Sequence, residues 1–144
     1  MNAISSQSLS PSDVSEPKPG AHLVVLAVDD ESAILRTFER NFRTKFDVKV
    51  ALGAEEALSM VEGIHPDVLV SDFSMPGMNG IELLRKCAEI FPDTIRVLAT
   101  AHAHTAEVVQ AHKNGVFTIL VEKPWTRSVM LDAITSAIAD GPPK

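Results

Sequence analysis

The stretch Val68–Gly80 reads VLVSDFSMPGMNG. Its first four residues are an apolar run typical of a buried strand, and the run ends on Asp72 before Pro76 and Gly77 interrupt any regular element. A carboxylate at the end of a buried strand is destabilising unless a cation or hydrogen-bond donors meet it. An isolated Asp before such a loop often only caps a turn. The importance of Asp72 therefore depends on what the rest of the chain brings near it.

Outward from this stretch, apolar strand-like segments alternate with segments of helical periodicity. Such alternation requires parallel strands joined by right-handed crossovers, with helices on both faces of the sheet. It predicts an α/β fold, a flavodoxin-like doubly wound sheet of five parallel strands in the order 2-1-3-4-5, with five helices. The predicted strands are residues 23–28, 48–52, 68–71, 95–99 and 118–122, and the predicted helices are residues 32–42, 54–61, 79/80–91, 105–113 and a last one after Thr126.

The bulk composition indicates one globular domain. The chain has 144 residues, of which 45% are hydrophobic, and a formal net charge of −6. We expect residues 1–20, rich in Ser and Pro, to be a disordered tail, residues 21–140 to be the domain, and residues 141–144 to be a second tail. The negative charge disfavours nucleic-acid binding, and no apolar run is long enough for a membrane span. A single cysteine and the lack of a signal-peptide pattern indicate a cytoplasmic protein.

Polar residues follow four of the predicted strands. Asp29 and Asp30 follow the first strand, Asp72 the third, Thr100 the fourth and Lys123 the fifth. The carboxyl ends of parallel strands meet at one edge of the sheet, and ligands bind there at the topological switch point. One lysine does not neutralise three carboxylates, whereas Mg²⁺ binds carboxylate oxygens readily. A carboxylate beside Mg²⁺, an ammonium group and a hydroxyl suits phosphoryl transfer.

The acidic pair, Asp72 with Met75-Pro76 and Gly80 behind it, Thr100 and Lys123-Pro124 together resemble the receiver domain of two-component response regulators, the CheY-like family. The resemblance covers about residues 23–139. It implies that the chain is a phosphoprotein of a two-component system, active in phosphorelay signal transduction and not an enzyme.

The resemblance also implies a role for each site residue. Asp72 would be the phosphoacceptor, receiving the phosphoryl group from a sensor histidine kinase or a phosphotransfer protein. Asp29, Asp30, Asp72 and the backbone carbonyl of Ser74 would bind Mg²⁺. Lys123 would contact the phosphoryl oxygens through a segment in which the bond to Pro124 is cis.

Thr100 would hydrogen-bond a phosphoryl oxygen and report its presence. Receivers usually carry Tyr or Phe three residues before the lysine, and this chain has Leu120 there. The signal is therefore expected to pass through residues 101–105 and the next helix. It would reach a downstream protein, or a second copy in a phosphorylation-dependent homodimer, through the fourth helix, the fifth strand and the fifth helix. The candidate contacts on this output face are Val109, Lys113 and Phe117.

Two alternatives remain open on the sequence. The chain could be a receiver module of a larger protein, such as a cyclic-dinucleotide phosphodiesterase or a hybrid kinase, which the Lys123-Pro124-Trp125 form resembles. It could instead be a Mg²⁺-dependent phosphohydrolase with an aspartyl-phosphate intermediate. Such enzymes of the haloacid-dehalogenase type need a second acid two residues after the nucleophile, and this chain has Ser74 there.

Overall fold

The computed structural model describes residues 23–142. The tail expected over residues 1–20 lies outside this range, as do residues 143 and 144. All ten predicted elements are present, with ends that differ from the predictions by a few residues at most. They are β1 (Val24–Asp29), α1 (Ser32–Phe42), β2 (Asp47–Leu52), α2 (Ala54–Ile64), β3 (Val68–Asp72), α3 (Gly80–Ile90), β4 (Ile95–Thr100), α4 (Ala106–Lys113), β5 (Ile119–Glu122) and α5 (Arg127–Asp140).

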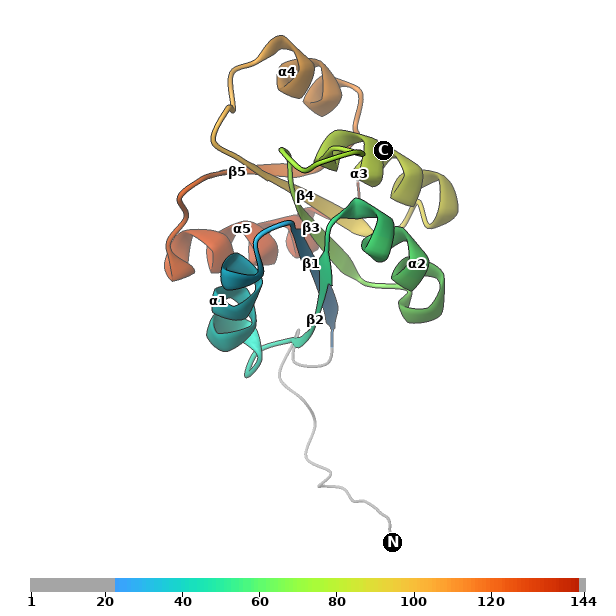
Figure 1. Ribbon diagram of the computed structural model, residues 1–144. Coiled ribbons are helices and arrows are strands. Elements are labelled where there is room, and N and C mark those ends of the chain that lie inside the picture. Colours follow the sequence, from blue (N-terminus) through green and yellow to red (C-terminus); the bar gives the residue numbers. More distant parts are fainter. Residues whose placement is uncertain (1–22, 143–144) are drawn as a thin grey trace, which may run out of the picture.

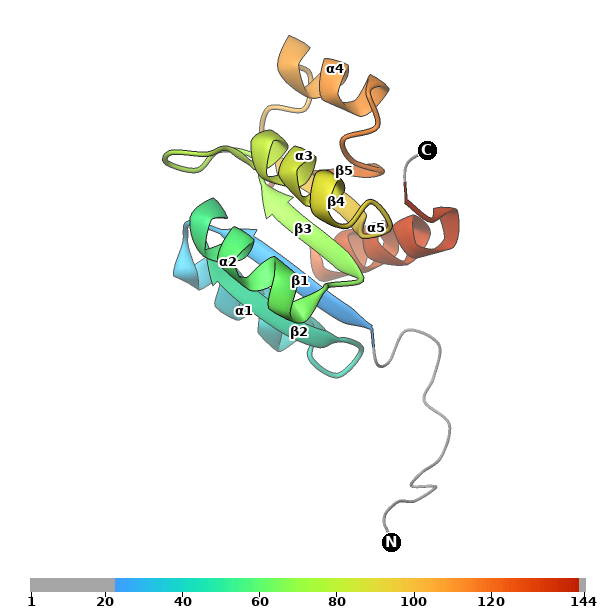
Figure 2. The ribbon, with the colours of Figure 1, turned by 90° about the vertical axis from the view of Figure 1, so that its right-hand side faces the viewer.

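The five strands form one parallel sheet in the order β2-β1-β3-β4-β5, as predicted. Figures 1 and 2 show α2 and α3 on one face of the sheet and α1 and α5 on the other, with α4 near the β5 edge. The strand order reverses between β1 and β3, because β1 connects to β2 on one side and β3 continues on the other. This topological switch lies where the acidic strand ends meet.

Two apolar cores fill the space between the sheet and its helices. Alternate residues of each strand point to opposite faces, so β4 sends Leu98 to the core under α2, α3 and α4 and Val97 to the core under α1 and α5. The central strand β3 is buried along its whole length. Asp72 therefore ends a strand that has no solvent-exposed face.

Side-chain caps mark the starts of three helices. Asn79 caps α3 in a reciprocal capping box with Glu82, and Thr105 and Thr126 cap α4 and α5 through their hydroxyl groups. Helix α2 runs three residues beyond the predicted Val61 and ends only at His65, which adopts the left-handed conformation. Among residues 23–142, no helix combines the length and apolarity that crossing a membrane requires.

Candidate functional site

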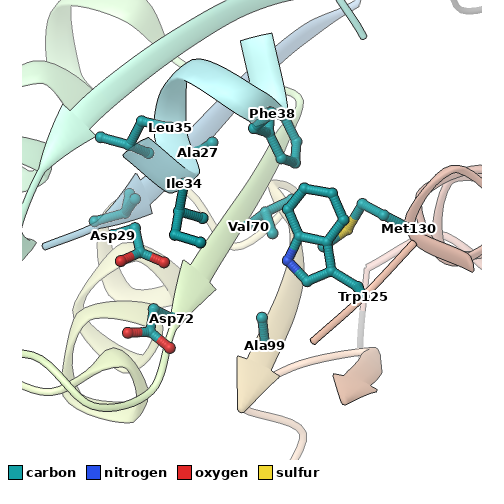
Figure 3. Close-up of a pocket in the computed structure, with 11 residues that line it drawn as sticks. Ala27, Asp29, Ile34, Leu35, Phe38, Val70, Asp72, Ala99, Trp125 and Met130 are labelled. Carbon is teal, nitrogen blue, oxygen red and sulfur yellow. The ribbon is translucent and has the colours of Figure 1, made fainter. Parts of the chain in front are cut away.

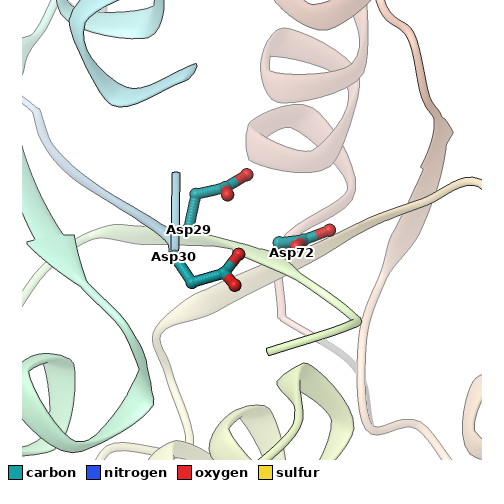
Figure 4. Close-up of side chains that lie close together, drawn as sticks. All are labelled: Asp29, Asp30 and Asp72. Carbon is teal, nitrogen blue, oxygen red and sulfur yellow. The ribbon is translucent and has the colours of Figure 1, made fainter. Parts of the chain in front are cut away.

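Three carboxylates gather at the topological switch of the sheet. Asp29 ends β1, Asp30 follows it, and Asp72 ends the neighbouring strand β3. One carboxylate oxygen from each lies within 4.8 Å of the others, as Figure 4 illustrates. Asp29 and Asp72 are buried, whereas Asp30 is exposed. The cluster is thus open to solvent on the side of Asp30.

Lys123 supplies the positive charge of the site. It follows β5, and its Nζ lies 3.1 Å from Asp72 Oδ1 and 3.2 Å from Asp29 Oδ2. The amide of Lys123 donates to the carbonyl oxygen of Thr100, which holds this segment against the end of β4. The Lys123–Pro124 peptide bond is cis, as the resemblance implied. One ammonium group is therefore shared between two buried carboxylates.

The shared lysine does not fully offset the crowding of negative charge. Burial raises the pKa of the Asp72 carboxyl, and the charges of Asp29 and Asp30 raise it further, against the opposing effect of Lys123. Burial lowers the pKa of Lys123, but its hydrogen bond with Asp72 and the two buried carboxylates outweigh burial, so that the net shift is upward. The ionised site thus has an excess of negative charge.

This excess suits a divalent cation. The donors are carboxylate oxygens from three residues. Such a set is typical of sites for hard cations such as Mg²⁺ and Ca²⁺, and less so of sites for zinc or copper. The buried pair gives fixed ligand positions, and the exposed carboxylate leaves room for water or for a further ligand. The acidic cluster can therefore bind a metal ion.

Thr100 and Ser74 differ in how firmly the fold holds them. Thr100 ends β4, is 1% exposed, and its hydroxyl accepts a hydrogen bond of 2.9 Å from the amide of His102. Ser74 lies in the exposed loop after β3. The threonine hydroxyl is thus oriented by the segment that leads to α4, whereas the carbonyl of Ser74 belongs to the loop that leads to α3.

The back of the site is closed by α3. The amide of Gly80 donates to the carbonyl oxygen of Phe73, and a Cβ atom at Gly80 would collide with the backbone carbonyl of Asp72. Only glycine permits this approach of the helix to the strand end. The MPGMNG sequence thus does more than end the strand, because it lets α3 begin directly against Asp72.

A small cavity borders the carboxylates on the α1 side. It has a volume of about 20 Å³ and is lined by Asp29 and Asp72 together with apolar side chains, among them Phe38 and Trp125 (Figure 3). The indole packs edge-on against Phe38 at 5.9 Å and beside Phe42 at 6.3 Å between ring centroids. Trp125 is thus half-buried against α1.

One residue of the predicted output face is not available for contacts. Phe117 is 1% exposed and stacks on His112, with ring centroids 5.0 Å apart, so its prediction as a surface contact is wrong. It lies two residues before β5, and its ring belongs to the core under α4. Val109 and Lys113 are exposed as expected.

Two polar residues with structural consequences were missed in the sequence. Arg96 lies inside β4 and is buried, although its strand reads as an ordinary apolar segment. Asn79 Nδ2 donates to Glu107 Oε2 at 3.4 Å, which links the start of α3 to the first turn of α4. A charged residue within an apolar run was a usable signal for Arg96, whereas nothing local indicates the Asn79–Glu107 pair.

Comparisons with known proteins agree with the geometry. Residues 25–135 match the response regulator receiver domain family. The chemotaxis protein CheY of Thermotoga maritima is 31% identical over 113 residues, which cover 76% of this chain and 92% of that protein. The transcriptional regulatory protein FixJ of Rhizobium meliloti is 32% identical over 111 residues, 76% of this chain and 54% of FixJ.

The solved structures give the same answer for the fold. The CheY-like receiver domain protein from Methanospirillum hungatei superimposes with a TM-score of 0.77 at 25% identity, covering 82% of this chain and 94% of that chain. Some relatives are much longer: the chain spans 24% of the hydrogenase transcriptional regulatory protein HoxA of Cupriavidus necator, with 25% identity over 79% of its own length. With its family match, its strand order and its acidic cluster at the sheet edge, the chain belongs to the response regulator receiver domains.

Proposed function

We propose that Asp72 accepts a phosphoryl group from a sensor histidine kinase or phosphotransfer protein in a Mg²⁺-dependent reaction. Receiver domains of response regulators generally act as signal transducers, and phosphorylation and Mg²⁺ binding are standard in the family. The observation that carries the proposal is the position of Asp72, buried beside two further carboxylates and 3.1 Å from Lys123 Nζ.

Each residue has a chemical role in this proposal. An Asp72 carboxylate oxygen attacks phosphorus while the N–P bond of a phosphohistidine breaks, giving an acyl phosphate and leaving the electron pair on the imidazole nitrogen. Lys123 contacts the transferred oxygens and offsets their charge. Asp29, Asp30 and the carbonyl of Ser74 would hold Mg²⁺ with Asp72, and the bound cation would stabilise the negative charge of the phosphoryl group.

Labelling by acetyl phosphate tests this proposal. With Mg²⁺ present, intact-mass spectrometry should detect one phosphoryl group on the wild-type chain and none on Asp72→Asn. Asp132→Asn, at an exposed acid on α5, is the matched control and should be labelled like the wild type. Full labelling of Asp72→Asn would refute the assignment. Asp30→Ala should reduce both metal affinity and labelling, and an unchanged metal titration would place the cation elsewhere.

The output would be a change of the surface formed by α4, β5 and α5. Thr100 gains a charge-assisted hydrogen bond when a phosphoryl group is present, and its movement would pull on the segment 101–105 that leads into α4. Leu120 is half-buried in the core under α4 and carries no polar tip. We propose that residues 101–105 carry the signal, that Thr100 reports it, and that a downstream protein or a second copy of the chain reads it.

Leu120→Tyr tests whether the missing aromatic side chain matters. If residues 101–105 carry the signal without an aromatic side chain, the wild type will show a hydrogen-exchange response at 101–105 when beryllofluoride occupies Asp72. Leu120→Tyr should then add a second response at β5. An identical response in Leu120→Tyr and wild type would mean that the leucine has no bearing on the route.

The proposed boundaries are residues 21–140 for the receiver domain, supported by the family match over residues 25–135 and by elements from Val24 to Asp140. We further propose that it acts in the cytoplasm, without nucleic acid or membrane as its partner. A phosphohydrolase activity is a poor alternative because Ser74 stands where a second acid would be needed. Release of phosphate from small phosphomonoesters would separate the two functions.

A further inference from the structure

Arg96 is a buried cation at the end of the sheet opposite the carboxylate cluster. It is 3% exposed. Because strand residues alternate between the two faces, Arg96 and Thr100 point to the same side of β4. At about 3.3 Å per residue they lie roughly 13 Å apart along the strand. One face of β4 thus carries Thr100 at one end and Arg96 at the other.

The guanidinium group hydrogen-bonds only backbone carbonyl groups among residues 23–142. Its Nε donates to Val116 at 2.8 Å and its Nη2 to Gly115 at 3.3 Å, while its Nη1 donates to Thr94 at 2.9 Å and to Pro92 at 3.3 Å. No carboxylate of the described part of the chain forms a salt bridge with it. The charge is therefore compensated by peptide dipoles.

These carbonyl groups follow the C-terminal ends of two helices. Pro92 comes directly after the C-cap of α3, and Gly115 directly after Asn114, the C-cap of α4. Helix C-termini carry partial negative charge and favour a cation. Arg96 therefore joins the loops that follow α3 and α4, and it places its charge near the C-terminal ends of both helices.

The C-terminal end of α4 is well formed around this contact. Gly115 has a φ of 74° and its amide donates to the carbonyl of His112, while the amide of Val116 donates to the carbonyl of Ala111. This pair of bonds is a Schellman motif. Arg96 thus hydrogen-bonds the carbonyl groups of Gly115 and Val116, the two residues that complete this motif.

The N-terminal end of α4 is held much less firmly. Within the helix only Val108 and Ala111 are buried. The first turn is tied to the rest of the domain by the exposed Asn79–Glu107 hydrogen bond of 3.4 Å, and the preceding loop by the exposed pair of His104 and Glu122 at 4.0 Å. Exposed contacts of this kind stabilise a structure much less than the buried, charged hydrogen bonds of Arg96.

We propose that Arg96 is the positioning residue that fixes the C-terminal end of α4, so that phosphorylation displaces the helix about this end as a pivot. The displacement by phosphorylation rests on the proposed function. The attachment of the C-terminal end of α4 to Arg96, called the clamp below, does not. The segment 101–109 moves with Thr100, and residues 115 and 116 stay bound to Arg96. The output face is thus altered mainly near the first turn of α4, beside Glu107, and little near Lys113 at the last turn.

Amide hydrogen exchange tests the clamp first on the unmodified wild-type chain, by NMR and without metal. The amides of Gly115 and Val116 should exchange about tenfold more slowly than those of Val109 and Gln110, because the charged hydrogen bonds of Arg96 hold their segment closed. Equal exchange at the two ends of α4 would overturn the clamp.

Arg96→Met keeps the volume and removes the donors and the charge. It should accelerate exchange at residues 115–117 by about tenfold, and Arg96→Lys, which retains the charge, should restore part of the protection. Arg85→Met, at an exposed arginine of α3, is the control and should change nothing at these residues. If Arg96→Met does not fold, Arg96→Lys decides: wild-type protection at residues 115–117 with the shorter lysine would refute the clamp.

Beryllofluoride with Mg²⁺ then tests the pivot. In the wild type, exchange should change at 101–109 and stay constant at 115–117, and in the Arg96 variant the change should extend through 115–117. A wild-type response that already reaches 115–117 would disprove the pivot. An absence of any response, with Asp72→Asn behaving identically, would instead count against the proposed phosphoryl site and would leave the metal-free result to decide the clamp.

Discussion

Helices α3 and α4 lie on the same face of the sheet, yet they are attached in opposite ways. Five of the residues of α3 are buried, and its first residue, Gly80, sits against the carbonyl of Asp72. In α4 only Val108 and Ala111 are buried. The helix that backs the carboxylates is thus fixed by packing, whereas the helix beside them is fixed chiefly at its far end. A domain that must hold a charged site rigid and still respond to it needs both kinds of attachment.

The largest effect is expected where α3 packs against the end of β3. Gly80→Ala places a methyl group against the Asp72 backbone, which no rotamer can relieve, and should lower the free energy of unfolding by about 4 kcal/mol. Urea denaturation measures it. Gly63→Ala in α2, where a Cβ meets nothing within 4 Å, is the control and should stabilise the chain by up to about 1 kcal/mol.

Truncation of buried side chains compares the two helices directly. Leu84→Ala in α3 should cost about 3 kcal/mol of stability, and Val108→Ala in α4 about 1.5 kcal/mol, because the valine loses fewer buried carbon atoms. Urea denaturation gives both values. Hydrogen exchange should further show global destabilisation for Leu84→Ala and local opening of α4 for Val108→Ala. Equal losses in the two helices would remove the proposed difference in attachment.

The pH dependence of stability sharpens the picture of the rigid site. The pKa of Asp72 is raised above its ordinary 3.8 in the folded chain, chiefly by burial and then by Asp29. A raised carboxyl pKa destabilises the fold when the group is ionised, and this loss is relieved as the pH falls through the folded pKa. In EDTA, Asp72→Asn should therefore melt above the wild type at neutral pH. The two melting temperatures should converge as the pH is lowered toward 4, and a constant difference would contradict the charge-crowding account.

Asp30→Asn should produce the smallest effect. This residue is exposed, so relief of its repulsion with Asp29 and Asp72 should raise stability in EDTA by no more than about 0.5 kcal/mol. Addition of Mg²⁺ should reverse the order, because the wild type binds the cation more tightly and gains more stability. Thermal melts with and without metal measure both effects. A variant that melts below the wild type in EDTA would show that Asp30 is not under repulsion.

The sequence predicted what local patterns determine. Alternation of apolar strands and amphipathic helices was enough for the strand order, and polar residues at strand ends were enough to bring Asp29, Asp30, Asp72 and Lys123 to one edge. Thr126 was readable as the cap of the last helix because capping depends on neighbouring residues alone.

What failed depends on packing between distant segments. Phe117 was read as a surface residue because a single aromatic after a loop has no periodicity that would place it in the core. The role of Arg96 depends on carbonyl groups up to 20 residues away in the chain, and the contact of Asn79 with Glu107 spans 28 residues. None of these partners is marked by residue type or spacing.

Trp125 gives the domain an optical property. The chain has one tryptophan and no tyrosine, so its near-ultraviolet emission arises almost entirely from this indole. The ring lies against Phe38 and lines the cavity that Asp29 and Asp72 also line. A cation or phosphoryl group bound at these carboxylates, as proposed, would change the electric field around the excited indole. The unlabelled wild-type protein can therefore report occupancy of its own site by fluorescence, in real time and without a reporter group that would disturb α4.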